Sequence, residues 1–348
     1  MNYSYPLLSI VIPHYNNFSI LKECIESLSH ITYSNYEIII VDNCSEDNSY
    51  KLIKDNFKNV NVYKTKNNLG YAGGCNFGAK YSKGKYILFL NNDTTHSINF
   101  IEPLIDFLEK NNHVASVQPK IKNYYNKEYF DYAGASGGFI DYLVYPFCRG
   151  RIFDTIEMDK NQYDNNFQVF WTSGTAFITR KEIFDLLSGF DEKLFCHMEE
   201  IDYCWKNYLL GFENYVIPKS VIYHKGAQSL KYNSYYKKYL NHRNSLILLL
   251  TNFQLYRTIK YFIPRFFLEL ISSFYELLNL RPKHFLIHYK TFIYLVLNIR
   301  YLLNRRKFTQ KIRKISDSKL INSNVILRKS IVKDYFLLNK KYFDRVIK

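Results

Sequence analysis

A strand-like run of apolar residues ends abruptly in polar side chains within the stretch YILFLNNDTT. Residues Tyr86 to Leu90 are apolar or aromatic, and Asn91, Asn92 and Asp93 follow them directly. A hard divalent cation that bridges two phosphates needs one or two protein carboxylates, which an acid at a strand end can supply. An ordinary turn residue is the alternative interpretation of Asp93 taken alone.

A second acidic group, in the stretch HMEEIDYCW, places Glu199, Glu200 and Asp202 in the first turn of a predicted helix. Acids are favoured there by the helix dipole, which gives an ordinary explanation for them. The apolar segments KLF and YCW on either side nevertheless favour a cleft. Glu199 and Asp202 share one helix face, whereas Glu200 points about 100° away, so the three acids need not serve one purpose.

Two further residues end predicted strands. Asp42 could accept hydrogen bonds from a base or a ribose, or it could cap the helix that follows. His224 could ligate a metal that a carboxylate already holds, although a single histidine is more often structural.

The segment NNLGYAGGCNFG, residues 67–78, contains four glycines and three asparagines. Its backbone could approach a ligand closely or adopt positive φ angles. It matches neither the dinucleotide-binding fingerprint nor a P-loop, so a plain loop is an equal alternative.

These residues are carried by apolar strands that alternate with helical patterns, which predicts an α/β fold with a mostly parallel sheet covered on both faces. In such a sheet the carboxyl ends of the strands meet at one edge, where a nucleotide would bind. The strands are predicted at residues 8–16, 36–43 and 86–91, and the helices at 19–30, 45–57 and 99–111. The polar residues at their ends are Tyr15, Asn16, Asn17, Asp42, Asn43, Asn91, Asn92 and Asp93.

The pattern becomes irregular at residues 120–170, where we expect a hairpin and loops over the site. It then resumes with a strand and a helix in VFWTSGTAFITRKEIFDLL. The next helix is predicted from about Met198 to Leu210, with Gly211 as its stop. A last strand ends on His224.

Charge divides the chain into an acidic and a basic part. Residues 1–230 carry a net charge of −4, whereas residues 231–348 carry +20. We therefore expect a catalytic domain at 1–230 and a basic, amphipathic helical region at 231–348. Its longest uncharged stretch has 13 residues, too few for the roughly 20 that a membrane-spanning helix needs.

Two interpretations of this basic region remain open. Basic helices with aromatic residues suit an anionic membrane surface; alternatively, they form a bundle on the catalytic domain with a solvated basic face. Nucleic acid is not an expected partner, because no recognisable nucleic-acid module is present. Six scattered cysteines without metal spacing predict reduced thiols in the cytoplasm, and the N-terminus resembles a first strand rather than a signal peptide.

Taken in order, the motifs resemble the inverting family 2 glycosyltransferases, specifically the branch with bacterial rhamnosyltransferases. The similarity covers about residues 7–250, through SIVIPHYNN, YEIIIVDNCSED, NNLGYAGGCNFG, LFLNNDT, SGTAFITRKEIF, MEEIDYCWK, HKGAQS and YLNHRNSLILL. The resemblance implies the GT-A nucleotide-sugar-binding fold. Two positions depart from the family pattern: Asn91 replaces the first Asp of the D-x-D metal motif, and Glu200 replaces the catalytic Asp.

The resemblance also implies roles for individual residues. Glu200 would be the catalytic base, with Glu199 and Asp202 beside it, and Asp42 would bind a uracil or thymine base. Asp93, His224 and Asn91 would hold Mg²⁺ or Mn²⁺ on the diphosphate. The donor-binding residues would be Pro13, Tyr15, Asn16, Asp42, Asn68, Gly73, Asn76, Asn92 and Gly174.

The sequence thus predicts a metal-dependent glycosyltransferase at the inner face of the cell membrane. It would move a sugar from a nucleoside-diphosphate donor, dTDP-rhamnose or a UDP-sugar, onto a growing, lipid-linked cell-surface glycan. A nucleotidyltransferase of sugar phosphates is one alternative, but PHYNNFS lacks the basic phosphate-binding loop it would need. A non-catalytic nucleotide-sugar-binding protein is the other.

Overall fold

The computed structural model describes residues 5–226 and 234–347. The predicted domain boundary at residue 230, and Ala227 to Ser229 of the HKGAQS segment, lie outside these ranges. The strands are β1 (Leu8–His14), β2 (Tyr36–Asp42), β3 (Asn61–Lys64), β4 (Tyr86–Leu90), β5 (Thr94–His96), β6 (Val114–Asn123), β7 (Gly138–Asp141), β8 (Pro146–Cys148), β9 (Arg151–Ile152), β10 (Thr155–Ile156), β11 (Phe167–Val169), β12 (Ala176–Arg180), β13 (Glu213–His224) and β14 (Ile326–Leu327).

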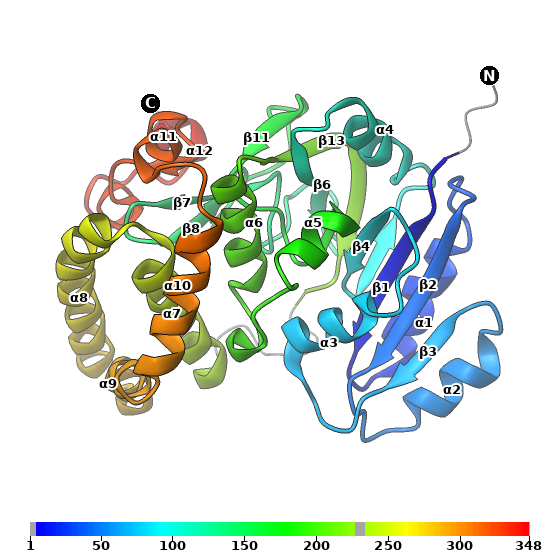
Figure 1. Cartoon of the computed structure of the whole chain (residues 1–348), viewed down its shortest axis with the longest axis horizontal. Coiled ribbons are helices and arrows are strands. Elements are labelled where there is room, and N and C mark those ends of the chain that lie inside the picture. The colour runs from blue at the N-terminus through cyan, green and yellow to red at the C-terminus, as the bar shows by residue number, and fades with distance from the viewer. Residues whose placement is uncertain (1–4, 227–233, 348) are drawn as a thin grey trace.

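Helices surround these strands and fill the C-terminal third (Figure 1). They are α1 (Phe18–Leu28), α2 (Ser49–Asn56), α3 (Gly70–Ala79), α4 (Glu102–Lys110), α5 (Lys181–Leu186), α6 (Glu199–Leu210), α7 (Tyr235–Asn252), α8 (Leu255–Leu278), α9 (Pro282–Leu297), α10 (Ile299–Ile312), α11 (Asp317–Asn322) and α12 (Phe343–Ile347), with a 3₁₀ turn η1 (Glu192–Leu194) and a π-helical turn η2 (Lys333–Leu337).

The central sheet has the strand order β11-β13-β6-β12-β4-β1-β2-β3, with β5 paired to β13. Strands β4, β1, β2 and β3 pair in parallel, as the apolar runs predicted. Beyond β4 the sheet is mixed, because β12 pairs antiparallel with both β4 and β6. The predicted α/β class is confirmed, and the parallel order is concentrated in the half of the sheet built first along the chain.

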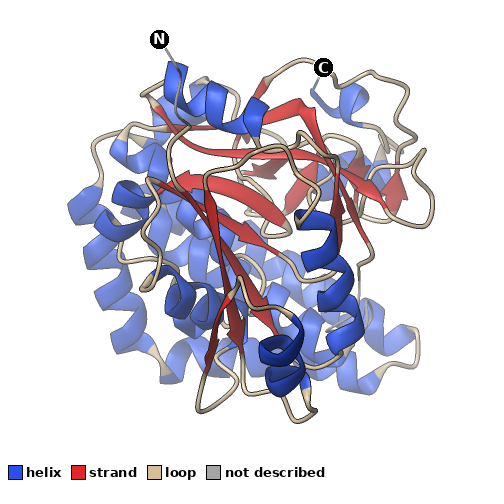
Figure 2. Ribbon diagram, turned by 90° about the vertical axis from the view of Figure 1, so that its right-hand side faces the viewer, coloured by secondary structure: helices blue, strands red, loops and turns tan. Residues whose placement is uncertain are grey.

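Alternate residues of the central strands enter two hydrophobic clusters, one on each face of the sheet. On β1, Ile10 and Ile12 pack with α1 and α4, whereas Val11 packs with α3 and the elements beyond it. Helices lie both in front of the strands and behind them in Figure 2. The parallel strands are therefore buried on both faces, which accounts for their nearly continuous apolar sequences.

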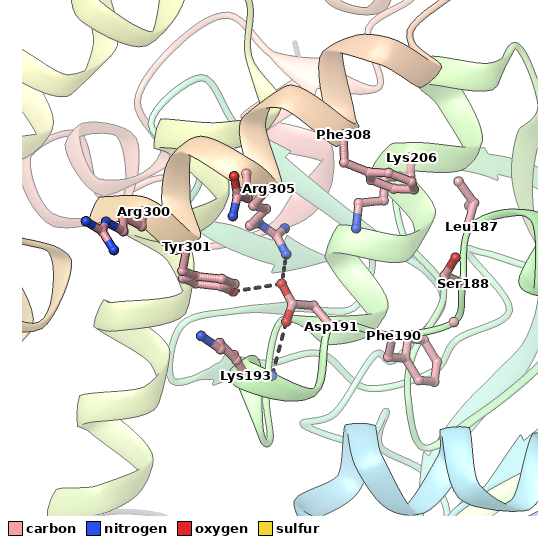
Figure 3. Close-up of a pocket in the computed structure, with 12 residues that line it drawn as sticks. Leu187, Ser188, Phe190, Asp191, Lys193, Lys206, Arg300, Tyr301, Arg305 and Phe308 are labelled. Carbon is pink, nitrogen blue, oxygen red and sulfur yellow. Dashed lines mark hydrogen bonds and ion pairs between the residues drawn. The ribbon is translucent and has the colours of Figure 1, made fainter. Parts of the chain in front are cut away.

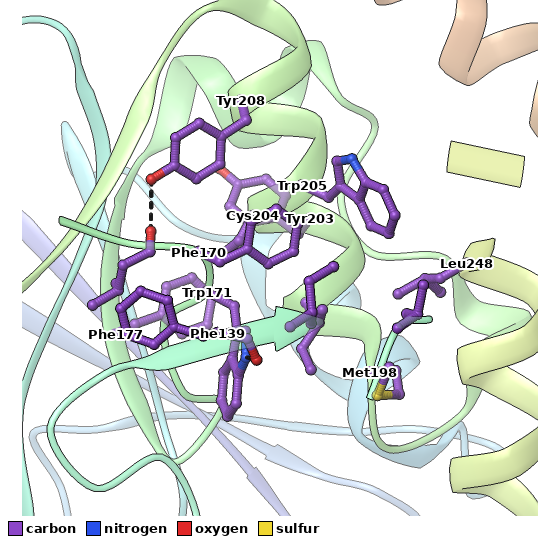
Figure 4. Packing of buried hydrophobic residues seen from close by; sticks show 14 of the residues in the cluster. Phe139, Phe170, Trp171, Phe177, Met198, Tyr203, Cys204, Trp205, Tyr208 and Leu248 are labelled. Carbon is purple, nitrogen blue, oxygen red and sulfur yellow. Dashed lines mark hydrogen bonds between the residues drawn. The ribbon is translucent and has the colours of Figure 1, made fainter. Parts of the chain in front are cut away.

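The larger cluster joins the central sheet and α6 to the C-terminal helices. Around α6, Trp205 packs edge-on against Phe170 and Phe253, and the Tyr208 hydroxyl donates to the Val169 carbonyl at 2.7 Å (Figure 4). Leu248 of α7 belongs to the same cluster. The helical region thus shares a core with the domain that precedes it.

Two segments differ from the sequence expectation. The glycine-rich segment forms the buried helix α3, not a loop, and its glycines permit close packing on the sheet. A Cβ added at Gly78 would lie 2.5 Å from Cγ1 of Val11. Residues 120–170 do contain the expected hairpin, β7 with β8, but it belongs to a second sheet, β10-β9-β8-β7-β14, whose last strand comes from the C-terminal region.

Candidate functional site

The parallel pairing of β1 and β2 brings their polar ends together. His14 lies opposite Asp42 in the register. The Asn92 amide contacts His14, with Nδ2 2.8 Å from Nδ1. Burial lowers the pKa of His14 to about 4, so its ring is neutral and can accept this hydrogen bond. Asp42, His14 and Asn92 therefore form one polar edge at the carboxyl ends of the strands.

The second group at this edge centres on His224. Because β5 pairs with the end of β13, placing Thr94 opposite His224, the histidine comes next to Asp93. Its Nε2 lies 3.1 Å from Oδ1 of Asp93 and 3.4 Å from Nδ2 of Asn91. The three predicted metal-binding residues are thus in contact.

Asp131, which the sequence analysis did not identify, contacts the other ring nitrogen. Its Oδ1 lies 2.9 Å from Nδ1 of His224. Burial alone would lower the pKa of His224, but the carboxylates of Asp93 and Asp131 outweigh it and hold that pKa well above its usual value. Burial would likewise raise the pKa of Asp93, yet His224 and Lys225 keep it below the usual range.

The donor set fits a divalent metal ion. One carboxylate and one imidazole face each other, and the second ring nitrogen is held by a further carboxylate, the arrangement that orients metal-binding histidines. A bound ion must displace the proton that His224 carries in the metal-free protein. Asp93 and His224 would hold the ion directly, and Asp131 would orient the histidine.

Glu199 and Glu200 begin α6 as predicted, and Gly211 ends that helix with a φ of 98°. Each of the two glutamates has one buried carboxylate oxygen without a hydrogen-bond partner among the described residues. Burial raises the pKa of Glu200 to about 7, and burial together with the neighbouring Glu200 raises the pKa of Glu199 well above its usual value. With a pKa of about 7, the Glu200 carboxylate can accept a proton near neutral pH.

Asp202 differs from these two acids because its carboxylate has charged and hydrogen-bonded partners. Its carboxylate pairs with Arg305, accepts a hydrogen bond from Asn252 at 2.8 Å, and lies 2.7 Å from Nζ of Lys206. These charges hold its pKa below the usual range although burial opposes them. A carboxylate with three partners is not available to an acceptor, and this pairing argues against the predicted catalytic role of Asp202.

The residues predicted for the nucleotide base lie around the β1 and β2 ends. Asp42 accepts a hydrogen bond from the Ser45 amide at 2.9 Å through Oδ1, while its buried Oδ2 has no hydrogen-bond partner among the described residues. Asn16 accepts from the Glu46 amide at 2.9 Å, and Tyr15 donates to the Glu46 carboxylate at 3.3 Å. Lys64 Nζ lies 3.7 Å from this second oxygen, which can still accept a hydrogen bond from a base N–H donor.

Other predicted donor-binding residues make packing contacts in the structure. Asn76 donates to the Phe190 carbonyl at 2.8 Å and accepts from the Phe190 amide at 2.9 Å, so its side chain fastens α3 to the segment before η1. Gly73 is buried within α3. Pro13 lies against the same helix at Gly74, where an added Cβ would come within 3.2 Å of the proline. These contacts argue against direct donor contacts for Asn76 and Gly73.

Asn68 and Gly174 occupy turns next to α3. Asn68 accepts from the Gly70 amide at 2.9 Å and thereby shapes the start of the helix. Gly174 accepts a hydrogen bond from the hydroxyl of Tyr71, a residue of α3. The pKa of this tyrosine is raised well above its usual value by burial, by Cys75 and by the nearby Glu199. Gly174 therefore lies on the side of α3 that faces the first turn of α6.

A cavity of about 530 Å³ lies between α10 and residues 187–193, and none of the predicted site residues lines it. Arg305 and the Tyr301 hydroxyl converge there on Asp191, and Lys193 lies over the Tyr301 ring (Figure 3). Arg305 also pairs with Asp202, as does Lys206 of the cavity wall. The cavity therefore marks the joint between the C-terminal helices and the catalytic part.

The sequence profile of glycosyl transferase family 2 matches residues 9–187, half of the chain. The chain belongs to glycosyl transferase family 2. The match covers β1 to α5, and therefore includes the strand-end groups around Asp42 and Asp93.

Curated relatives of this family 2 chain share parts of the same region. It is 34% identical over 143 residues to glycosyltransferase GlyG of Streptococcus pneumoniae, covering 40% of this chain and 44% of that protein. It is 36% identical over 105 residues to an uncharacterised glycosyltransferase of Haemophilus influenzae, covering 30% of this chain and 35% of that protein. The matched region thus spans less than half the length of each of these relatives.

Solved structures share the GT-A fold of this family 2 chain. One is GalNAc-T7 with UDP, GalNAc and Mn²⁺, at 17% identity and a TM-score of 0.59 over 74% of this chain and 50% of that one. Another is residues 1–349 of Staphylococcus aureus TarS with UDP, at 17% identity and a TM-score of 0.50 over 73% and 69% of the two chains. The likeness confirms the predicted fold.

Proposed function

We propose that this protein is a metal-dependent, inverting glycosyltransferase. It transfers a sugar from a nucleoside-diphosphate donor, dTDP-rhamnose or a UDP-sugar, to a hydroxyl group of a growing, lipid-linked cell-surface glycan. The observation that carries the proposal is the contact of Asp93 with His224 at the carboxyl edge of the sheet, with Asp131 on the other ring nitrogen. The family 2 match and the fold shared with UDP-bound and Mn²⁺-bound structures support it.

Each group of residues has a defined part in the proposed reaction. Asp42 binds the uracil or thymine base through Oδ2, which has no hydrogen-bond partner among the described residues, and Asp93 and His224 hold Mg²⁺ or Mn²⁺. When bound, such an ion neutralises negative charge on a diphosphate leaving group.

Glu200 accepts the proton of the acceptor hydroxyl. That oxygen forms the new bond to the anomeric carbon from the face opposite the diphosphate. The bond from the anomeric carbon to the phosphate oxygen breaks, and the nucleoside diphosphate leaves with the electron pair. A single displacement inverts the configuration.

The proposed place of action is the cytoplasmic face of the cell membrane, where the proposed lipid-linked acceptor is held. Residues 231–348 are strongly basic, and basic segments are attracted to anionic lipid surfaces. Among the described residues, no helix combines the length and the hydropathy required to cross a bilayer.

Binding and turnover test the proposed function separately. A panel of nucleotide sugars with Mn²⁺ should raise the melting temperature for the true donor, and Asp93→Asn should weaken the Mn²⁺-dependent part of that rise. Glu200→Gln should retain donor stabilisation and lose at least about 100-fold in transfer or donor hydrolysis.

Two outcomes would overturn parts of this proposal. Full activity in Glu200→Gln would refute the base assignment, and donor binding without any turnover by the native protein would favour a non-catalytic binding protein. A nucleotidyltransferase is disfavoured because the turn between β1 and α1, residues 15–17, holds no lysine or arginine for a triphosphate.

A further inference from the structure

Helix α8 turns its polar residues toward the protein. Its buried residues are Thr258, Tyr261, Arg265, Glu269 and Ser273, and only Tyr261 is aromatic. In an ordinary surface helix the buried stripe is apolar and the charged stripe faces water. Helix α8 therefore buries polar side chains and exposes apolar ones, the reverse of an ordinary surface helix.

A buried ionic network accounts for the inward polar face. Arg265 pairs with Glu269 at 2.8 Å and donates to the Leu143 carbonyl at 2.7 Å. The second oxygen of Glu269 accepts from Nδ1 of His242 on α7 and of His288 on α9, at 2.8 and 2.6 Å. These hydrogen bonds and charges hold α8 against its neighbours, in addition to the packing of Tyr261, Phe262 and Leu268 on the core.

The histidines and Glu269 lie within 4.8 Å of one another, close enough to consider a metal ion. The guanidinium of Arg265 already neutralises the carboxylate, and every oxygen of Glu269 is paired. A divalent cation bound to Glu269 would be repelled by the positive charge of Arg265 on the same carboxylate. We therefore interpret the cluster as the joint that orients α8.

The outward face of α8 is a continuous apolar stripe. Side chains at intervals of three or four residues are 55–83% exposed, and Lys260 is the last exposed charged residue before Arg281. The stripe consists of Ile259, Ile263, Phe267, Ile271, Phe274 and Leu278. This spacing places all six on one side of the helix.

Helix α9 extends this apolar surface. It packs against α8, and its residues Leu286, Ile293, Val296 and Leu297 are also more than half exposed. In Figure 1 both helices lie at the edge of the molecule opposite β1 to β3. Large contiguous apolar patches are rare on monomeric proteins in water and mark contact with an apolar partner.

The charges around this surface identify the kind of partner. The exposed residues Lys260, Arg281, Lys283 and Lys290 border it. The nearby Glu276 pairs with Lys238 at 3.0 Å and with Arg281 at 3.7 Å, so the cations outnumber the acids. An apolar face with a cationic rim complements the surface of an anionic lipid bilayer. A second copy of this chain would present cations against cations, so self-association through this face is disfavoured.

We propose that the outward face of α8 and α9, which we name the α8–α9 face, inserts into the surface of an anionic lipid membrane. Helix α8 has 24 residues and lies in the plane of the interface with its apolar stripe among the acyl chains. The proposal deepens the membrane location proposed above and assigns it to this face rather than to the basic charge of the whole region.

Vesicle flotation with the full-length protein tests the proposal. The native protein should float with vesicles of mixed phosphatidylcholine and phosphatidylglycerol and bind phosphatidylcholine alone much more weakly. The triple variant Ile263→Ser, Phe267→Ser and Ile271→Ser should lose binding by at least about tenfold. These side chains are exposed, and circular dichroism and thermal unfolding verify that the variant folds.

A matched control replaces three equally exposed apolar residues of the catalytic part, Ile98, Tyr125 and Leu186, with serine. This control should float like the native protein. Insertion is also read directly: tryptophan placed at Phe267 should shift its emission to the blue with vesicles, whereas tryptophan at Ile98 should not. The two native tryptophans, Trp171 and Trp205, are buried and supply a constant background.

Three results would overturn the proposal. These are flotation of the triple serine variant at the native level, failure of the native protein to bind anionic vesicles, and a native dimer in light scattering that the triple variant converts to monomer. The last result would assign the face to self-association. None of the measurements uses donor, metal or acceptor, so failure here leaves the proposed glycosyl transfer to be judged by its own assay.

Discussion

At the scale of single residues, the protonation state of Glu200 sets when a base is available. Burial raises the pKa of this carboxyl to about 7, and one of its oxygens has no hydrogen-bond partner among the described residues. The raised pKa keeps the carboxyl protonated below neutral pH. A general base must lose that proton before it can accept another.

The rate of transfer should therefore depend on pH in a defined direction. We expect kcat/KM to fall about tenfold per pH unit well below 7, where Glu200 is protonated, and to level off above it. Steady-state rates at saturating Mn²⁺ across this range, corrected for inactivation, measure the profile. Glu200→Asp keeps a carboxylate and should keep an acidic limb with a lower rate, whereas an unchanged rate down to pH 5 would exclude Glu200 as the base.

The sequence predicted part of this site at residue resolution. His224 ends β13 as predicted, and Asp93 follows the predicted strand β4. Their contact depends on the pairing of β5 with β13, which the sequence did not reveal, and their metal role stays a prediction. Asp131 could not be found, because it lies in an irregular segment and reaches His224 from 93 residues away. The contacts of Asn76 and Asp202 could not be foreseen either, because polar residues within a motif can serve packing as well as ligand binding; their predicted roles stay predictions.

At the scale of elements, the conversion of the glycine-rich segment into helix α3 has a steric cause. Gly78 faces β1 so closely that an added Cβ would lie 2.5 Å from Cγ1 of Val11 and 3.0 Å from Cγ2 of Val41. Glycine is a poor helix former, and no helix was predicted here from the sequence. Contact with the sheet overrides that propensity.

Gly78→Ala should therefore destabilise the protein. Alanine would gain about 1 kcal/mol of helix propensity, but overpacking against β-branched valines on a central strand costs about 1–3 kcal/mol. The expected net result is a lower free energy of unfolding in urea. Gly78→Ala combined with Val11→Ala, which removes the clashing methyl groups, should recover part of the loss; a Gly78→Ala variant as stable as the native protein would contradict this packing.

Other elements followed from sequence to different degrees. The apolar runs of β1, β2 and β4 and the stop of α6 at Gly211 were predicted, because local pattern determines them. The strands of the second sheet are two to four residues long, and one of them, β7, pairs with β14 from the far end of the chain. No local periodicity can reveal such strands, since only the tertiary fold brings their partners together.

At the scale of the whole molecule, the acidic and basic parts of the chain are joined by buried charge. Arg305 of α10 pairs with Asp191 before η1 and with Asp202 of α6. Asn244 of α7 also donates to the carbonyls of Leu194, Cys196 and His197, just before the first turn of α6. The C-terminal helices therefore support the segment that presents Glu200, in addition to carrying the α8–α9 face.

Replacing Arg305 should lower the free energy of unfolding of the whole protein. Arg305→Met leaves the buried Asp202 with less compensating charge, and breaking a buried ion pair in this way costs about 3–5 kcal/mol. Urea unfolding should show that loss, and adding Asp202→Asn should recover part of it because the uncompensated charge is removed. Arg300→Met, on the exposed side of the same helix, is the matched control and should change the unfolding free energy by less than about 0.5 kcal/mol. Equal stability of the Arg305 and Arg300 variants would show that the two parts of the chain are held together by apolar packing alone.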